Sequence, residues 1–152
     1  MYLVSDILRT KGHDVWSIHA DATVYEALQM MADKDVGALV VIDKGQVVGI
    51  FSERDYARKV ILAGLSSLNT PVKQIMSTGV YYVTPDQSIE ECMAVMTKNR
   101  VRHLPVIVNE QLVGLVSIGD AVKSIISDQD IQIRQFENYI SGRGYSADPL
   151  QL

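Results

Sequence analysis

The chain has 152 residues, of which 47% are apolar and 21% charged, a composition typical of an ordinary globular protein. Its formal net charge of −4 and pI of about 5.3 argue against a nucleic-acid partner, because nucleic-acid-binding proteins usually carry a basic face. No apolar run approaches the ~20 residues that cross a bilayer, and the first ten residues lack a signal-peptide pattern. A single cysteine cannot form an internal disulfide, which fits a reducing compartment. We therefore expect a cytoplasmic protein with no membrane partner.

The predicted elements occur in the same order twice along the chain. β-branched and aromatic runs are typical of strands, and a hydroxyl followed three residues later by glutamate marks the start of a helix. The first set is a strand at 15–18, a helix from Thr23, strands at 38–42 and 46–51 around a turn at 43–45, and a helix from Asp55 that Gly64 closes. The second set is a strand at 80–83, a helix from Ser88, strands at 104–108 and 111–116, and a helix from Asp120.

A shift of 65 residues superimposes the two sets. Residues 21–58 align with residues 86–123 without a gap, and twelve of the 38 pairs are identical. A single copy of ~60 residues would be marginal alone. We therefore predict an α+β fold of two β-α-β-β-α repeats, related by a pseudo-twofold axis, with their sheets packed against each other over a shared core. The expected divisions are 1–66 for the first repeat with an N-terminal lead-in, 67–127 for the second repeat, and 128–152 for a C-terminal helix and loose tail.

The C-terminal segment has no counterpart in the first copy. Ile133, Phe136 and Ile140 recur at helical spacing, and Gly142 would end that helix. We expect the apolar stripe to pack on the chain's own domain, with dimerisation as the alternative.

Each copy ends with the same seven-residue pattern: Gly, two apolar residues, Ser, two variable residues and Asp. It reads GIFSERD at 49–55 and GLVSIGD at 114–120. One interpretation is structural, because Ser and Asp at this spacing can cap the following helix. The other is functional, because helix N-termini attract phosphates and an acidic residue can accept hydrogen bonds from a ribose diol. The pattern suits a cap and a ligand together.

A tandem β-α-β-β-α pair in which each copy ends G-h-h-S/T-x-x-D (h apolar) resembles the cystathionine-β-synthase (CBS) domain pair, or Bateman module. The resemblance covers about residues 10–127. The chain is similar to small stand-alone bacterial and organellar CBS pairs in three segments: SERDYAR at 52–58, RHLPV at 102–106 and VSIGD at 116–120. The resemblance implies a non-catalytic regulatory module for signal transduction, which controls a separate protein of unknown identity. It also implies a homodimer. The implied ligands are AMP, ADP, ATP, NAD(H) or S-adenosylmethionine.

The resemblance also implies which residues hold the nucleotide. The motif aspartate would hold the ribose and the motif serine would lie near ribose or phosphate. In this chain these residues are Asp55 with Ser52, and Asp120 with Ser117.

Positive charge is expected at the phosphates. Basic residues on the strand after the first helix match Arg102 and His103, whereas the aligned first-copy positions are Gly37 and Ala38, so two unequal clefts are expected. Arg54, Arg58 and Lys59 add charge near the first motif, with a solvated helix face as the alternative interpretation.

Adenine needs an apolar slot with backbone edges. The candidates are Ala38 and the strand at 16–18 in one copy, with Tyr82 and Leu104 in the other; Trp16 and Tyr82 also suit a core.

Catalysis is not expected. Cys92 aligns with Ala27 on the buried stripe of a helix, so we assign it to the core rather than to a nucleophile. His13, His19 and His103 have no metal-ligand spacing, so no metal is expected. The competing function is a ligand-free dimeric scaffold that docks a partner enzyme.

Overall fold

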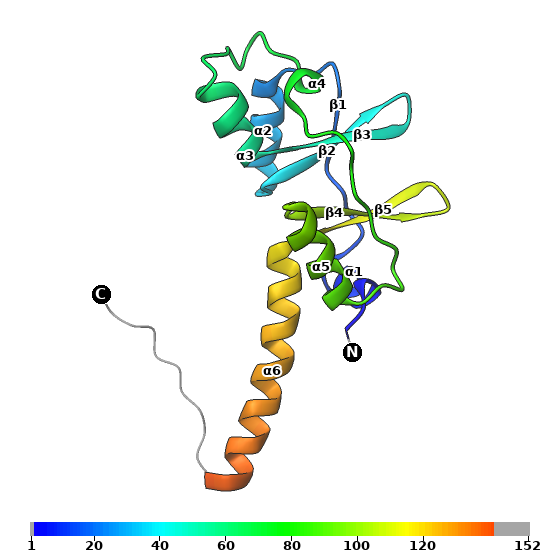
Figure 1. Ribbon diagram of the computed structural model, residues 1–152, viewed down its shortest axis with the longest axis vertical. Coiled ribbons are helices and arrows are strands. Elements are labelled where there is room, and N and C mark those ends of the chain that lie inside the picture. Colours follow the sequence, from blue (N-terminus) through cyan, green and yellow to red (C-terminus); the bar gives the residue numbers. More distant parts are fainter. Residues whose placement is uncertain (1, 142–152) are drawn as a thin grey trace, which may run out of the picture.

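The computed structural model describes residues 2–141, apart from the side chains of residues 128–131 and 141. Two small α+β units lie one above the other, and a long helix extends from the second (Figure 1). The elements are α1 (Val4–Lys11), β1 (Ser17–His19), α2 (Val24–Lys34), β2 (Ala38–Asp43), β3 (Gln46–Ser52), α3 (Glu53–Asp55), the π-helix η1 (Tyr56–Ile61), α4 (Val72–Ile75), α5 (Ile89–Asn99), β4 (His103–Val108), β5 (Gln111–Ser117) and α6 (Ile118–Ser141). The α+β repeat architecture predicted from the sequence is confirmed.

The capping residues predicted from the sequence begin both long repeat helices. Thr23 Oγ1 accepts from the Glu26 N–H at 3.1 Å, and Glu26 accepts from the Thr23 N–H at 3.0 Å. Ser88 caps α5 by accepting from the Glu91 N–H at 3.1 Å. Among the described contacts, the return bond from Glu91 is missing, so only the first repeat has the full capping box.

Each repeat contains an antiparallel hairpin. In the first repeat, β2 pairs antiparallel with β3 and parallel with β1. In the second, β4 pairs antiparallel with β5 in a sheet of two strands. Both hairpins turn through two residues with positive φ, Lys44 (51°) and Gly45 (74°), then Asn109 (49°) and Glu110 (65°). Such turns match the twist of the flanking strands.

The strand predicted at 80–83 is wrong, because the described chain there has only an isolated bridge between Val83 and Val106. In the first repeat, the Val40 N–H donates to the Trp16 carbonyl at 3.2 Å. The residue aligned with Val40 is Pro105, which has no N–H to donate. The second sheet therefore lacks the bond that extends the pairing in the first.

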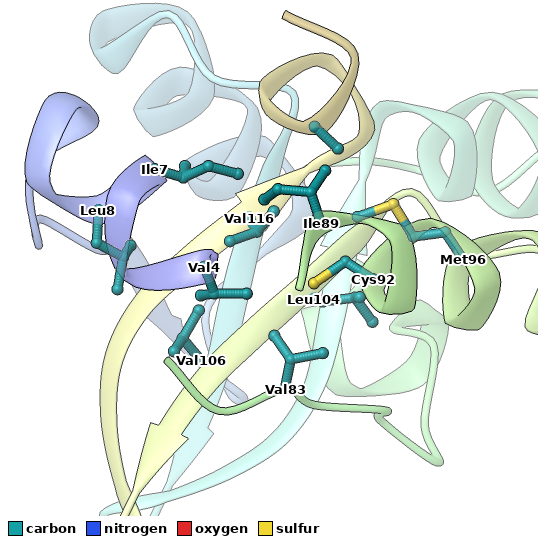
Figure 2. Close-up of a cluster of buried hydrophobic side chains, with 11 residues drawn as sticks. Val4, Ile7, Leu8, Val83, Ile89, Cys92, Met96, Leu104, Val106 and Val116 are labelled. Carbon is teal, nitrogen blue, oxygen red and sulfur yellow. The ribbon is translucent and has the colours of Figure 1, made fainter. Parts of the chain in front are cut away.

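The two short helices that precede the repeats are exchanged between them. Val4, Ile7 and Leu8 of α1 lie in the core of the second repeat, beside β4, β5 and α5 (Figure 2). Val72 and Ile75 of α4, which precedes the second repeat, lie in the core of the first. Neither repeat would have a complete core without the segment that leads into the other.

The motif glycines make this exchange possible. A Cβ on Gly114 would lie 2.5 Å from Leu8 Cδ2 of α1. A Cβ on Gly49 would lie 2.6 Å from Met76 Sδ and 2.9 Å from the Ser77 carbonyl oxygen. Each glycine therefore admits a segment from the other half of the chain against its strand.

The shared core expected between the repeats is replaced by two separate clusters of buried residues. The sheets are nevertheless covered on both faces. Leu39 and Val41 of β2 are buried in the first cluster, while Val40, which points to the opposite face, is also fully buried.

Helix α6 runs without a break from the second motif to Ser141, so the helix expected near residue 130 is its second half. Figure 1 shows it extending away from both repeats. The expectation that its apolar stripe packs on its own domain is wrong, because Ile133, Phe136 and Ile140 are 52%, 67% and 67% exposed. Gly142 and the tail lie outside the described residues.

Candidate functional site

A cavity of about 440 Å³ lies where the two repeats meet. One wall comes from the first motif and the start of the helix after it, a second from the segment that joins the repeats, and a third from the turn between α5 and β4. The lining residues are Gly37, Ile50, Ser52, Glu53, Arg54, Asp55, Arg58, Lys59, Ser77, Thr78, Gly79, Val80, Tyr81, Arg100, Val101, Arg102 and His103.

The first motif holds its aspartate by the capping box that the sequence predicted. Asp55 Oδ2 accepts from the Ser52 N–H at 3.0 Å and from Ser52 Oγ at 3.1 Å. The Asp55 N–H in turn donates to Ser52 Oγ at 3.2 Å. These bonds fix the carboxylate at the end of β3, so one oxygen serves the helix start.

The other oxygen of Asp55 faces the segment that joins the repeats. Oδ1 accepts from Ser77 Oγ at 3.0 Å and pairs with Lys59 Nζ at 2.9 Å. Ser77 is itself held in place, because its backbone exchanges two hydrogen bonds with Ile50 of β3. The carboxylate is thus aimed at the cavity wall rather than only at its own helix, although just 7% of Asp55 is exposed.

Ser77 was not predicted from the sequence. It lies in the joining segment, where the same shift of 65 residues places Gly12 opposite it, so the repeat carried no signal for a hydroxyl there. Only the antiparallel bridge between Ser77 and Ile50 brings this residue to Asp55.

Positive charge from both repeats gathers in the cavity. The lining contains five cationic side chains against the carboxylates of Glu53 and Asp55; the cations are Arg54, Arg58, Lys59, Arg100 and Arg102. Arg54, Arg58 and Arg102 are therefore brought together as the sequence suggested. Arg100 was missed: it ends α5 at a φ of 54°, which directs the chain into the cavity wall.

His103 lies in electrostatic reach of both motifs. Burial lowers the pKa of its imidazole and nearby Lys11 lowers it further, whereas Asp120 and, more weakly, Asp55 raise it. The net direction is below the usual range, so His103 is mainly neutral at pH 7. It can donate or accept a hydrogen bond in the cavity without adding a full charge.

The residues of the second motif do not line this cavity. Asp120 Oδ2 accepts from the Ser117 N–H at 2.8 Å, and the Asp120 N–H donates to Ser117 Oγ at 3.1 Å, which repeats the capping geometry. Lys11 at the end of α1 then donates to Asp120 Oδ2 at 2.7 Å and to the Leu115 carbonyl at 2.9 Å. Partial burial alone would raise the pKa of Asp120, but the bonds from Lys11 and Ser117 lower it.

Sequence reasoning did not identify Lys11. The same shift of 65 residues places Met76 opposite it. The cation on Asp120 therefore comes from a lead-in helix, whereas the cation on Asp55 is Lys59 of the helix that follows its own motif. Ala38 is also outside the cavity lining: it pairs with Ser52 across the hairpin and is 2% exposed.

Trp16, Tyr82 and Leu104, the side chains considered for adenine, do not line the cavity. Trp16 lies under Lys34, whose Nζ is 4.4 Å from the ring centroid, and Leu104 is fully buried in the second core. Tyr82 is exposed beside the lining residue Tyr81. The apolar part of the lining comes instead from Ile50, Val80 and Tyr81.

The thiol of the chain lies apart from the cavity lining. Cys92 is fully buried in the second core, and burial raises the pKa of its thiol to about 11. Within residues 2–141, no group of three or more His, Cys, Asp or Glu side chains is placed to hold a metal ion. A carboxylate beside hydroxyls, and next to several guanidinium groups, is suited to binding a sugar and phosphates.

The exchanged lead-in helices and the duplicated motif define a tandem α+β repeat module with a cavity between its halves. The chain belongs to the CBS-domain family, since the CBS domain model matches residues 4–61 and 72–127. CBS pairs are regulatory modules that often bind adenosyl ligands.

Relatives and solved structures agree with this assignment. The chain is 39% identical to the mitochondrial CBS domain-containing protein CBSX3 of Arabidopsis thaliana, over 93% of this chain and 73% of that protein. The solved structure of a protein with CBS domains from Burkholderia ambifaria is 48% identical, has a TM-score of 0.80, and aligns over 84% of this chain and 96% of that one. The fold is also that of a hexameric CBS-CP12 protein from bloom-forming cyanobacteria, with 24% identity and a TM-score of 0.74 over 90% and 85% of the two chains.

Within residues 2–141, none of the helices combines the length and the apolar character that a bilayer-spanning segment needs.

Proposed function

We propose that this protein binds an adenine nucleotide in the cavity between its repeats and that the bound nucleotide regulates a separate protein. The observation that carries the proposal is the joint presence of Asp55 and five cationic side chains in one cavity built from both repeats. The cavity volume of about 440 Å³ falls within the range of small-molecule sites. AMP, ADP, ATP, NAD(H) and S-adenosylmethionine are the candidate ligands.

The cavity offers a distinct environment for each part of a nucleotide. We place the ribose hydroxyls at Asp55 Oδ1, where Ser77 and Lys59 now bind. Phosphates suit Arg54, Arg58 and Arg102, because a guanidinium can donate to two phosphate oxygens at once. The base suits the apolar lining.

One nucleotide per chain is the expected stoichiometry. Both motif aspartates pair with a lysine, Asp55 with Lys59 and Asp120 with Lys11. The cavity with the arginine cluster, however, is lined by the first motif and not by the second. The sequence expectation of two unequal sites becomes a proposal of one occupied site, with Ser117 and Asp120 acting as a helix cap.

Regulation would follow from the position of the cavity. A nucleotide that contacts Asp55 in one repeat and Arg102 in the other would favour one arrangement of the two repeats. A bound partner protein can respond to that preference if the ligand has different affinities for the two arrangements. Small-angle scattering should therefore show a change in shape when the nucleotide is added.

The remaining assignments rest on the same reasoning. We propose that the chain is a regulator rather than an enzyme, since its single thiol is buried and protonated at pH 7. A reducing compartment suits that thiol, and both the cytoplasm and the mitochondrion, where CBSX3 is found, meet this condition. A homodimer is proposed, whereas the CBS-CP12 relative is hexameric.

A thermal-shift panel tests the nucleotide proposal. A ligand at ~100 times its dissociation constant stabilises the fold by about 2.7 kcal/mol, which for a chain of this size raises the melting temperature by about 5–10 °C. We expect this rise with at least one of AMP, ATP or NAD(H), and none with guanosine nucleotides. No rise with any adenosyl ligand at saturation would favour the ligand-free scaffold.

Asp55→Ala and Asp120→Ala form a matched pair for calorimetric titration, because both aspartates cap a helix through the same bonds. Loss of hydrogen bonds from a charged acceptor should weaken nucleotide binding about 10- to 150-fold in Asp55→Ala. Asp120→Ala should bind as the wild type does. Equal binding by both variants would contradict a role for Asp55 beyond its cap.

A further inference from the structure

Four guanidinium groups line the cavity without a carboxylate partner. Arg54 and Arg58 come from α3 and η1, and Arg100 and Arg102 from the turn between α5 and β4. In the described part of the chain, none of these four side chains forms an ion pair with a carboxylate. The fifth cation of the lining, Lys59, is by contrast paired at 2.9 Å with the motif aspartate. The unpaired positive charge of the cavity therefore comes from guanidinium groups of both repeats.

The aligned positions of the other repeat do not carry this charge. The residues aligned by the shift of 65 are Gly119, Lys123 and Ser124 for Arg54, Arg58 and Lys59, and Asp35 and Gly37 for Arg100 and Arg102. Five cations thus correspond to one lysine and one aspartate, so the formal charge is +5 at the cavity positions and zero at the aligned ones. A requirement of the fold would apply to both repeats. The cations of the cavity therefore indicate a ligand of opposite charge.

The amount of charge selects among the candidate ligands. With five cations and the two carboxylates of Glu53 and Asp55, the formal charge of the lining is +3. A phosphate monoester such as that of AMP carries about −1.5 to −2 charges at pH 7 and has only three acceptor oxygens, fewer than the donors of four guanidinium groups. We infer that the cavity selects a nucleoside diphosphate or triphosphate over a nucleoside monophosphate, an inference that rests on the nucleotide function proposed above. S-adenosylmethionine, which has a sulfonium in place of a phosphate chain, is disfavoured by the same charge.

The two pairs of arginines bind different phosphates of this ligand. Arg54 and Arg58 lie in the same continuous segment as Asp55, formed by α3 and η1, so a ribose at Asp55 brings the first phosphate to this pair. Arg100 and Arg102 belong to the other repeat and line the same cavity, so they receive the phosphates that follow. A monophosphate engages the first pair only. The second pair is therefore the part of the site that distinguishes the length of the phosphate chain.

Arg100 is the residue of the second pair that can be replaced with least effect on the fold. It ends α5 with a left-handed backbone at a φ of 54°, and Asp35 ends α2 in the same way at 53°. The two repeats thus accept side chains of opposite charge at this position. Because asparagine tolerates a left-handed backbone, Arg100→Asn removes the guanidinium and keeps the end of the helix.

Calorimetric titration of the full chain with AMP, ADP and ATP tests the selection, because these ligands share base and ribose and differ only in the phosphate chain. Divalent cations are left out and the ionic strength is held constant. ADP and ATP should bind at least about tenfold more tightly than AMP, since they add charge-assisted hydrogen bonds to guanidinium groups. Equal affinities for AMP and ATP would overturn the selection and leave the nucleotide function intact. No binding of any of the three would contradict the nucleotide function itself, and the selection with it.

Three variants test which arginine reads which phosphate. Arg100→Asn should weaken ATP binding about tenfold or more and leave AMP binding unchanged, whereas Arg58→Gln should weaken both by similar factors. The matched control is Lys98→Asn, which removes an exposed positive charge from the same end of α5 but outside the lining and should change neither affinity. An equal loss of AMP and ATP binding in Arg100→Asn, or a loss of ATP binding in Lys98→Asn as large as in Arg100→Asn, would overturn the assignment. Circular dichroism should confirm that all three variants are folded.

Discussion

Substitution of the two motif glycines by alanine tests whether the packing of the exchanged segments against the strands affects ligand binding in the cavity. Gly49 and Gly114 occupy the same position in the two repeats, and each lies against a segment from the other half of the chain. At Gly114, the nearest atoms to an added Cβ are the terminal carbons of Leu8, at 2.5 and 3.1 Å. A leucine side chain can change rotamer, so this site can relax in part.

Gly49 has less room to relax. An added Cβ would lie 2.6 Å from Met76 Sδ, which can move, but also 2.9 Å from the Ser77 carbonyl oxygen, which belongs to the backbone. That backbone is bonded to Ile50 by N–H···O bonds of 2.9 and 3.0 Å. Displacement of Ser77 would also move the hydroxyl that donates to Asp55 at 3.0 Å.

The two variants should therefore differ in both stability and ligand binding. Overpacking of a closely packed site costs about 1–3 kcal/mol, and we expect Gly49→Ala near the upper end and Gly114→Ala near the lower end. For a chain of this size the melting temperature should fall by roughly 6–12 °C and 2–4 °C, respectively. Gly49→Ala should also weaken nucleotide binding several-fold, whereas Gly114→Ala should not.

Urea denaturation and calorimetric titration on both variants provide the measurements. Equal destabilisation of the two variants would contradict the distinction between a mobile side chain and a fixed backbone oxygen. Unchanged binding by a destabilised Gly49→Ala would show that the position of Ser77 does not matter for the ligand, and the link between packing and site would be refuted.

Three further experiments have defined outcomes. Glu110→Gly should stabilise the fold by about 0.5–1 kcal/mol in urea denaturation, because Glu110 has a φ of 65° where the first repeat has Gly45; the reverse change, Gly45→Glu, should destabilise it. Lys11→Met should raise the pKa of Asp120, measured by NMR. In the wild type, the lowered pKa of Asp120 stabilises the fold at pH values above the unfolded-state pKa of this residue, and this stabilisation is lost on acidification. The variant should therefore be about 0.5–1 kcal/mol less stable than the wild type at pH 7 and equally stable in strong acid. Cys92 should react with a thiol reagent only as fast as the chain unfolds, since it is fully buried and its thiol has a pKa of about 11; rapid reaction under native conditions would contradict its place in the core.

The sequence by itself determined the features that depend on neighbours along the chain. Capping at Thr23, Ser88, Ser52 and Ser117 requires only a hydroxyl and an N–H three residues later, so the pattern could be read directly. The duplication likewise fixed the two hairpins at matching positions. One error was avoidable, because Pro105 lacks the N–H that the strand predicted at 80–83 needed.

The tertiary structure alone decided which segments meet across the chain. The exchange of α1 and α4 between the repeats, the hydroxyl of Ser77 at Asp55, and Lys11 on Asp120 join residues 22 to 109 positions apart. A periodic pattern specifies which face of an element is apolar. Both repeats present nearly the same apolar face, so the pattern does not indicate which repeat a lead-in helix covers. That choice depends on the side chains that fit beside Gly49 and Gly114, and it is what makes two similar motifs unequal.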